Sequence, residues 1–138
     1  MLKNKHRVPN SQIICDEDGV GGGLVDILKC KGFVNNSKAL NGENYQNLKT
    51  QCYYMLANAI NGRDIYIHAS LSTNQQDWII EEMQQIKADN RDIDGKLRII
   101  NKEQVKQNIG RSPDYSDSIA MRMWFNLKPA GNINIAFV

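Results

Sequence analysis

The residues best suited to chemistry in this sequence are two small groups of aspartates. Asp16 directly follows the apolar stretch 12–15, and sites in open α/β sheets gather at the carboxyl ends of strands. Asp114 and Asp117 lie three positions apart, which places both on one face of the first turn of a helix. The simpler interpretation of each group is structural, because aspartates also form turns and offset the helix dipole.

A bound divalent cation would give both groups a chemical role. Asp114 and Asp117 repel each other mildly at this spacing, so a cation between them would stabilise the pair. No histidine or cysteine is close enough in sequence to indicate zinc, and an all-carboxylate site suits a hard ion such as Mg²⁺ or Mn²⁺. Carboxylates from a strand end and a helix start could hold two such ions about 4 Å apart, the arrangement used for in-line phosphodiester displacement.

A glycine-rich segment, residues 19–23, follows the first acidic group. It lacks the Lys-Ser/Thr pair of a phosphate loop, and Leu24 stands where a dinucleotide fingerprint needs glycine. The segment is either a flexible turn between strand and helix or a place where backbone N–H groups meet a phosphate, and the two uses are compatible. The phosphate could belong to a nucleotide or to a nucleic acid. We expect Glu17 and Asp18 to be solvated or to form the turn.

The size and charge of the chain set wider limits. Its 138 residues suit one domain with a substantial core. Seventeen basic and 15 acidic residues give a net charge of +2, which is too balanced to indicate nucleic-acid binding by itself. No apolar run approaches the ~20 residues that span a bilayer, and the N-terminal segment lacks the apolar core of a signal peptide. We therefore expect a cytoplasmic protein without membrane contact, whose three cysteines stay reduced and mostly buried.

Apolar periodicity predicts strands and helices that alternate along the chain. Short apolar or alternating stretches predict strands at residues 12–15, 33–34, 64–69 and 96–100. Helical spacing predicts helices at 24–28, 44–61, 74–88 and 112–127, with a short helix or turn at 101–110. This alternation predicts the α/β class with one central sheet.

Two motifs resemble a known family. The segment IICDEDGVGGGLVDIL, residues 13–28, resembles the second acidic motif of the nuclease domain in phage terminase large subunits. The segment GRSPDYSDSIAMRMWF, residues 110–125, resembles the closing motif of that family. Between them, residues 44–67 resemble the long helix and strand of the family, and residues 95–110 resemble its lysine-bearing segment. The resemblance covers residues 12–127, and the order and spacing of the motifs are more specific than any one of them.

This resemblance implies a ribonuclease H-like fold, with a central mixed sheet flanked by helices. It also implies a two-metal endonuclease that cuts concatemeric viral DNA at the start and end of packaging into a capsid. By position, Asp16 matches the acid of the second motif, Asp114 matches the acid of the last motif, and Asp117 is its neighbour on the same helix. All three would be catalytic residues and ligands of Mg²⁺ or Mn²⁺.

The same resemblance suggests which residues contact double-stranded DNA. Gly21 and Gly22 clear room for a DNA backbone beside the first acidic group. Lys102 and Lys106 fall in the lysine-bearing segment and would face DNA phosphates, although a solvated helix face is an equal alternative for both. Arg111 precedes the last motif and is a similar candidate.

Two features of the family are not found in this sequence. The first catalytic aspartate of the family lies on an opening strand upstream of the second motif, and no acidic residue precedes Asp16. The ATPase domain of the family is not present either. We therefore expect a C-terminal fragment, from phage or prophage, that lacks the opening strand of its sheet. A missing ligand would lower metal affinity, and an unpaired sheet edge would favour self-association.

The expected organisation is a polar lead-in at residues 1–11, a nuclease-like domain at 12–127 and a tail at 128–138. The leading functional hypothesis is a metal-dependent DNA endonuclease of a packaging motor. One alternative is a non-catalytic docking module that contacts the portal or other packaging proteins. Another is a different ribonuclease H-like nuclease, such as a junction resolvase. A nucleotide-binding domain is the least favoured, because the phosphate-loop lysine is absent.

Overall fold

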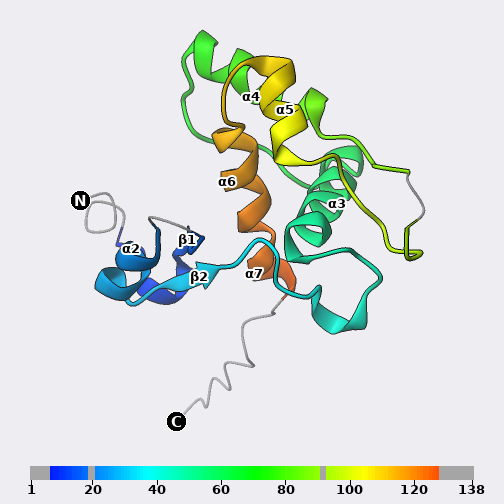
Figure 1. Ribbon diagram of the computed structural model, residues 1–138. Helices are drawn as coiled ribbons and strands as arrows, with labels where there is room; N and C mark the ends of the chain where they lie inside the picture. The colour runs from blue at the N-terminus through cyan, green and yellow to red at the C-terminus, as the bar shows by residue number, and fades with distance from the viewer. Residues whose placement is uncertain (1–6, 19–20, 91–92, 128–138) are drawn as a thin grey trace.

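The computed structural model describes residues 7–18, 21–90 and 93–127 (Figure 1). The strands are β1 (Ile14–Asp16) and β2 (Lys31–Phe33). The α-helices are α2 (Gly21–Leu28), α3 (Leu48–Asn61), α4 (Thr73–Gln85), α5 (Lys102–Ile109), α6 (Asp114–Arg122) and α7 (Trp124–Leu127). Short 3₁₀ helices, η1 (Asn10–Gln12) and η2 (Leu40–Gly42), complete the elements.

The N-terminal part is a small βαβ unit. The strands β1 and β2 are parallel, with Ile14 opposite Lys31 and Asp16 opposite Phe33. Helix α2 connects them and packs against both strands. Because the strands are parallel, both carboxyl ends lie at the same edge of the sheet, and Asp16 stands at that edge.

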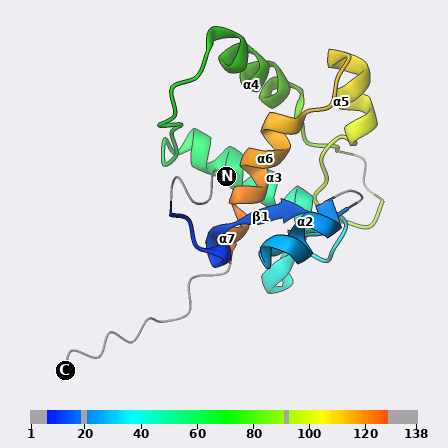
Figure 2. The same cartoon turned by 90° about the vertical axis from the view of Figure 1, so that its left-hand side faces the viewer.

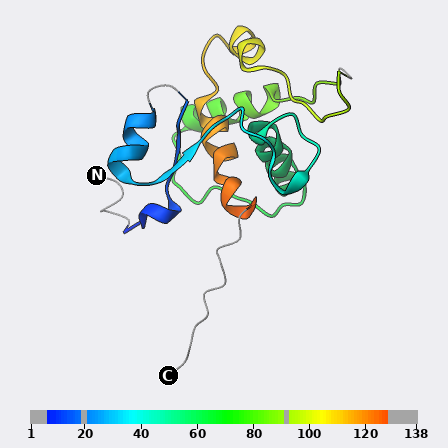
Figure 3. The same ribbon diagram turned by 60° about the horizontal axis from the view of Figure 1, so that its bottom comes forward.

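Helix α6 is the central element of the structure. It packs against α3 and α4, and Figure 3 shows it, in orange, between the blue and cyan βαβ unit and the teal α3. Figure 2 shows α6 crossing α3, with α4 and α5 above. The core is built around these contacts by Phe33, Leu48, Cys52, Tyr53, Leu56, Ala120, Met123 and Leu127.

The sequence of α3 explains both its start and its buried face. Asn47 is the N-cap, and its side-chain oxygen accepts a hydrogen bond from the Thr50 N–H at 2.9 Å, which satisfies one of the free donors of the first turn. Leu48, Cys52 and Leu56 follow at intervals of four and lie on the core face. The predicted helix at 44–61 is therefore confirmed, except that it begins four residues later than its apolar pattern.

The sheet is smaller than the sequence predicts. The α/β class is confirmed, but among the described residues the strands form one two-stranded sheet. The strand prediction at 64–69 is wrong, because this stretch has no ladder with another strand, and Tyr66 is 82% exposed. Residues 96–100 make only isolated bridges, from Leu97 to Tyr45 and from Ile99 to Ala88. Alternation predicts an extended backbone, but a strand also needs a partner for its hydrogen bonds.

The three cysteines are free thiols, but only Cys52 is buried, whereas the sequence predicted mostly buried thiols. Cys52 is buried in the core, and burial raises the pKa of its thiol to about 12. Cys15 and Cys30 are half-buried, with their sulfur atoms 3.6 Å apart.

Residues 1–6 of the expected lead-in and the whole expected tail at 128–138 lie outside the described residues. Within the described ranges, no helix is both long and apolar enough to cross a membrane.

Candidate active site

Asp16 is held at the sheet edge by an asparagine that follows the neighbouring strand β2. One of its carboxylate oxygens accepts hydrogen bonds from the Asp18 N–H at 3.0 Å and from Asn35 Nδ2 at 3.1 Å. Asn35, which lies just beyond β2, also donates to Asp18 through Nδ2 at 2.7 Å and through its backbone N–H at 2.8 Å. Asp18 is an exposed turn residue, as predicted, and it also accepts these two hydrogen bonds from Asn35. The parallel strand ends bring these three residues together because they share one edge of the sheet.

Asp117, in the first turn of α6, is the other anchored carboxylate. Lys49 Nζ lies 2.7 Å from one of its oxygens and Lys102 Nζ lies 2.8 Å from the other. The Tyr53 hydroxyl donates a hydrogen bond at 2.6 Å to the oxygen that Lys49 contacts. The Asp117 side chain is 13% exposed. Burial acts to raise its pKa, but the charge of Lys49 and the three hydrogen bonds outweigh burial and leave the pKa below its usual value.

Two helices, α3 and α5, supply the partners of Asp117. Lys49 and Tyr53 are four residues apart on α3, so they lie on one face of that helix. Lys102 is the first residue of α5, placed by the Asn101 N-cap. Burial raises the pKa of the Tyr53 hydroxyl, and the charge of Asp117 raises it further. Tyr53 therefore remains a neutral hydrogen-bond donor.

Lys102 connects the two acidic groups electrostatically. Burial acts to lower its pKa, but the hydrogen bond and charge of Asp117, and then the charges of Asp114 and Asp16, raise it above its usual value. All three predicted aspartates therefore lie close enough to Lys102 to stabilise its charged form. Asp114 is exposed, and among the described residues it is Asp117 that makes the direct side-chain contacts.

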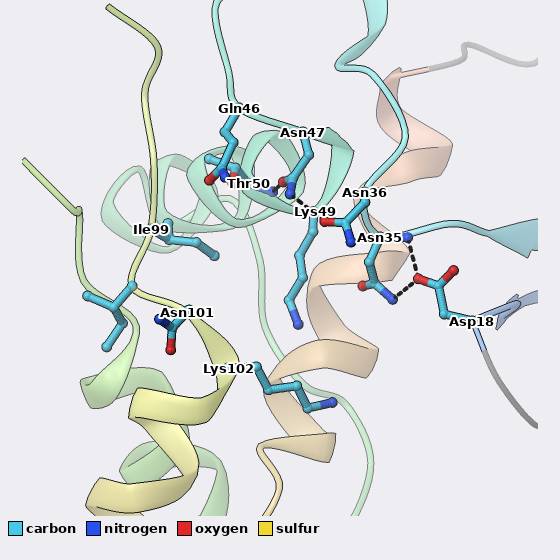
Figure 4. A pocket seen from close by; sticks show the side chains of 11 residues that line it. Asp18, Asn35, Asn36, Gln46, Asn47, Lys49, Thr50, Ile99, Asn101 and Lys102 are labelled. Carbon is cyan, nitrogen blue, oxygen red and sulfur yellow. Dashed lines mark hydrogen bonds between the residues drawn. The ribbon is translucent and has the colours of Figure 1, made fainter. Parts of the chain in front are cut away.

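A cavity of about 340 Å³, lined mostly by residues with polar side chains, lies beside Lys49 and Lys102. Figure 4 shows Lys49 and Lys102 reaching toward it from α3 and the start of α5, with Asp18 and Asn35 on the opposite wall. Its lining comprises Asp18, Asn35, Asn36, Gln46, Asn47, Lys49, Thr50, Ile99, Ile100, Asn101 and Lys102.

Two of the predicted DNA contacts are engaged elsewhere in the molecule. Lys106 lies 3.1 Å from Glu103, one turn earlier on α5. Arg111 pairs with Glu82 and, at 2.8 Å, with Glu81. The Arg111 ion pairs tie the loop before α6 to α4, whereas the Lys106 pair lies within α5. A contact of Lys106 or Arg111 with DNA stays a prediction.

Gly21 and Gly22 are the first residues of α2, close to the acidic edge. A Cβ atom on Gly22 would meet only the Glu17 carbonyl oxygen, at 3.8 Å, and one on Gly23 would meet nothing within 4 Å. Packing among the described residues therefore does not require glycine at positions 22 and 23. The flexible turn and the phosphate contact both remain open as explanations.

Sequence reasoning missed three residues of this site, namely Asn35, Lys49 and Tyr53. The position of Asn35 could have been predicted, because it follows the second predicted strand and the carboxyl ends of parallel strands lie at one edge of a sheet. Lys49 and Tyr53 were hidden because the apolar pattern of their helix indicated only a core face. Their role depends on the approach of α6, which is a tertiary contact.

The donor set suits a hard divalent cation, although it is not a closed cage. Within residues 7–18, 21–90 and 93–127, no three histidine, cysteine, aspartate or glutamate side chains gather closely enough to hold a metal. The ammonium groups of Lys49 and Lys102 stand at contact distance from Asp117, where a cation would be held. Mg²⁺ is typically bound through one or two carboxylates plus water and substrate phosphates, and a metal site at Asp16, Asp114 and Asp117 stays a prediction.

No family model and no curated protein matches the sequence. Solved structures do match. The nuclease domain of the large terminase subunit gp2 of bacterial virus Sf6 has a TM-score of 0.71 and 20% identity, over 88% of this chain and 67% of that one. A lysine-to-alanine mutant of that domain with manganese has a TM-score of 0.71 and 20% identity, over 88% of this chain and 68% of that one. A mutant solved with calcium has a TM-score of 0.68 and 20% identity, over 88% of this chain and 67% of that one. The chain therefore has the fold of a phage terminase nuclease domain, and the predicted ribonuclease H-like class is confirmed.

Proposed function

We propose that this chain is the nuclease domain of a phage DNA-packaging terminase, which hydrolyses phosphodiester bonds of double-stranded DNA. The observation that carries the proposal is Lys102, whose ammonium group contacts Asp117 at 2.8 Å and whose charged form is also stabilised by the charges of Asp114 and Asp16. The shared fold supports the same reaction class, since the neighbours are nuclease domains. The protein would act in the cytoplasm of the bacterial host, together with the portal or other terminase components.

Asp16 and Asp117 would hold the metal ion, with Asp114 at its exposed side. Neighbouring structures were solved with manganese and calcium, which supports Mg²⁺ or Mn²⁺ as the working ion. Such an ion supplies a Lewis acid for the phosphate and acidifies a bound water. The Asp117 carboxylate is ready for this use, because its lowered pKa keeps it ionised at neutral pH.

The lysines and the tyrosine prepare the site for a phosphate. Lys49 and Lys102 carry two positive charges against the single negative charge of Asp117, and this surplus lowers the repulsion between the acids and an approaching DNA backbone. Tyr53 holds one carboxylate oxygen in a fixed direction through its 2.6 Å hydrogen bond. Asn35 does the same for Asp16.

One observation favours the docking module as a second candidate. Both oxygens of Asp117 already have a lysine partner, so this carboxylate is satisfied without a metal. A domain that only contacts other packaging proteins, or a second copy of itself, would need nothing more from these residues.

Nicking of supercoiled plasmid with Mn²⁺ distinguishes the two candidates. We expect Asp16→Asn and Asp117→Asn each to lower the nicking rate by roughly 100-fold or more, because several kcal/mol of transition-state stabilisation depend on the metal site. Asp77→Asn, an exposed aspartate on α4, is the matched control and should nick like the wild type. Thermal melts establish that each variant is folded. Equal nicking rates in the wild type and all three variants would contradict the assignment of Asp16 and Asp117 to a catalytic metal site.

A further inference from the structure

The cavity beside the acids has walls of an unusual kind. Five carboxamide side chains line it, and they come from three separate segments of the chain: Asn35, Asn36, Gln46, Asn47 and Asn101 (Figure 4). Carboxamides carry both a donor and an acceptor, and they are the side chains that read base edges in nucleic acids. The volume of about 340 Å³ falls at the lower end of the range for small-molecule sites, roughly 300–1,000 Å³.

Several of these groups are free to meet a ligand. Asn101 uses its oxygen to cap α5 through the Gln104 N–H, and its NH₂ group has no hydrogen-bond partner in the described part of the chain. The side chain of Gln46 is exposed, and its carboxamide has no hydrogen-bond partner among the described residues. Asn36 accepts a hydrogen bond from Asn47 at 3.1 Å, which leaves its own NH₂ group available.

The position of the cavity relates these groups to the cutting site. Lys49 and Lys102 form its wall on the side of Asp117, and Asp18 lies on the side of Asp16. Ile99 and Ile100, which are half-buried, add apolar surface between the polar groups, against which the flat face of a base could pack. A ligand with a charged end and a flat polar end matches this arrangement.

We propose that this cavity holds one nucleotide of the DNA strand next to the phosphate that is cut. Its phosphate faces Lys49 and Lys102, and the edge of its base makes hydrogen bonds with Gln46, Asn36 and Asn101. The inference rests on the proposed nuclease function and adds to it a consequence for specificity. Cutting then depends on the base that occupies the cavity, rather than on the DNA backbone alone.

The test measures DNA binding separately from cleavage. Fluorescence anisotropy with a labelled DNA duplex in Ca²⁺ reports affinity, and the positions of nicks made with Mn²⁺ report base preference. The variants are the double substitution Gln46→Ala with Asn36→Ala, and Asn101→Asp, which keeps a helix-capping oxygen while removing the donor. Gln107→Ala, at an exposed glutamine on the far part of α5, is the control.

We expect the double variant and Asn101→Asp to bind DNA roughly 5-fold or more weakly and to lose the base preference of the wild type. Gln107→Ala should retain both. Unchanged affinity and an unchanged nick pattern in both cavity variants would overturn the inference. A second outcome would also overturn the inference: the cavity variants bind DNA more weakly, but the wild type shows no base preference. The cavity would then bind only a phosphate. Binding by the wild type without nicking would contradict the proposed function alone.

Discussion

At the scale of single residues, the site depends on how two carboxylates are held in place. Asp117 has three donors from α3 and α5, and Asp16 has a donor from Asn35. A carboxylate with fixed partners keeps its orientation, and preorganised polar groups stabilise charge without rearrangement during the reaction. Asn35 is the residue that joins Asp16 to the neighbouring strand.

Replacement of Asn35 with alanine should therefore impair cleavage more than folding. The change removes the side-chain hydrogen bonds to Asp16 and Asp18 and leaves the backbone bond to Asp18 in place. We expect a 10–100-fold lower nicking rate, the usual cost of losing a residue that orients a metal ligand. Asn58→Ala, at an exposed asparagine on α3, controls for the substitution type. A wild-type rate in Asn35→Ala would show that Asp16 needs no such support.

The low pKa of Asp117 predicts an acid-sensitive stability in the absence of metal. Its folded pKa lies below the ordinary value of 3.8, so ionisation stabilises the folded state fully above that value. This contribution is lost as the pH falls through the folded pKa, because the unfolded chain then binds the proton more tightly. Urea unfolding in EDTA from pH 5 to pH 3 should show the loss in the wild type. In Asp117→Asn, the free energy of unfolding should depend less steeply on pH over this range. The same pH dependence in both proteins would contradict a lowered pKa of Asp117.

At the scale of elements, the N-terminus of α3 places both Lys49 and the polar cavity. Asn47 caps this helix and also donates to Asn36 across the cavity. The first turn of α3 therefore has to be formed for the cavity wall and the lysine to be correctly placed.

Substitution of the cap should lower stability by a measurable amount. Asn47→Ala removes the acceptor for the Thr50 N–H, and we expect a loss of about 1 kcal/mol in the free energy of unfolding. Asn47→Asp retains an acceptor at the same position and should recover most of that loss. Chemical denaturation measures both. Equal losses in the two variants would mean that the cap does not limit stability.

Comparison of the elements shows what sequence patterns can and cannot supply. The places of Asp16 at a strand end and of Asp114 and Asp117 in the first turn of a helix were predictable, because both are local signals, while their role as metal ligands stays a prediction. Their partners Lys49 and Tyr53 were not, because these lie on a helix whose pattern reports burial alone. The stretch 64–69 shows the same limit, since alternation indicates extended backbone but cannot report whether another strand lies beside it.

At the scale of the whole molecule, one buried ion pair joins helices that are far apart in the sequence. Glu82 on α4 is fully buried and accepts hydrogen bonds from Arg111 and, at 2.7 Å, from the Ser116 N–H at the start of α6. The contact fixes the first turn of α6 against α4. That turn carries Asp117, so the packing of the molecule and the geometry of the site share this connection.

Removal of Glu82 should accordingly destabilise the fold far more than removal of its exposed neighbour. Glu82→Ala leaves the Ser116 N–H and the guanidinium without their buried partner, and we expect a loss of about 3 kcal/mol in the free energy of unfolding. Glu81→Ala removes the other partner of the same arginine, but Glu81 is half exposed, so the loss should stay below about 1 kcal/mol. Urea denaturation of both variants makes the comparison within one ion-pair cluster. Similar losses in the two would show that α4 and α6 are held together by apolar packing instead, because the buried carboxylate would then contribute no more than a surface charge.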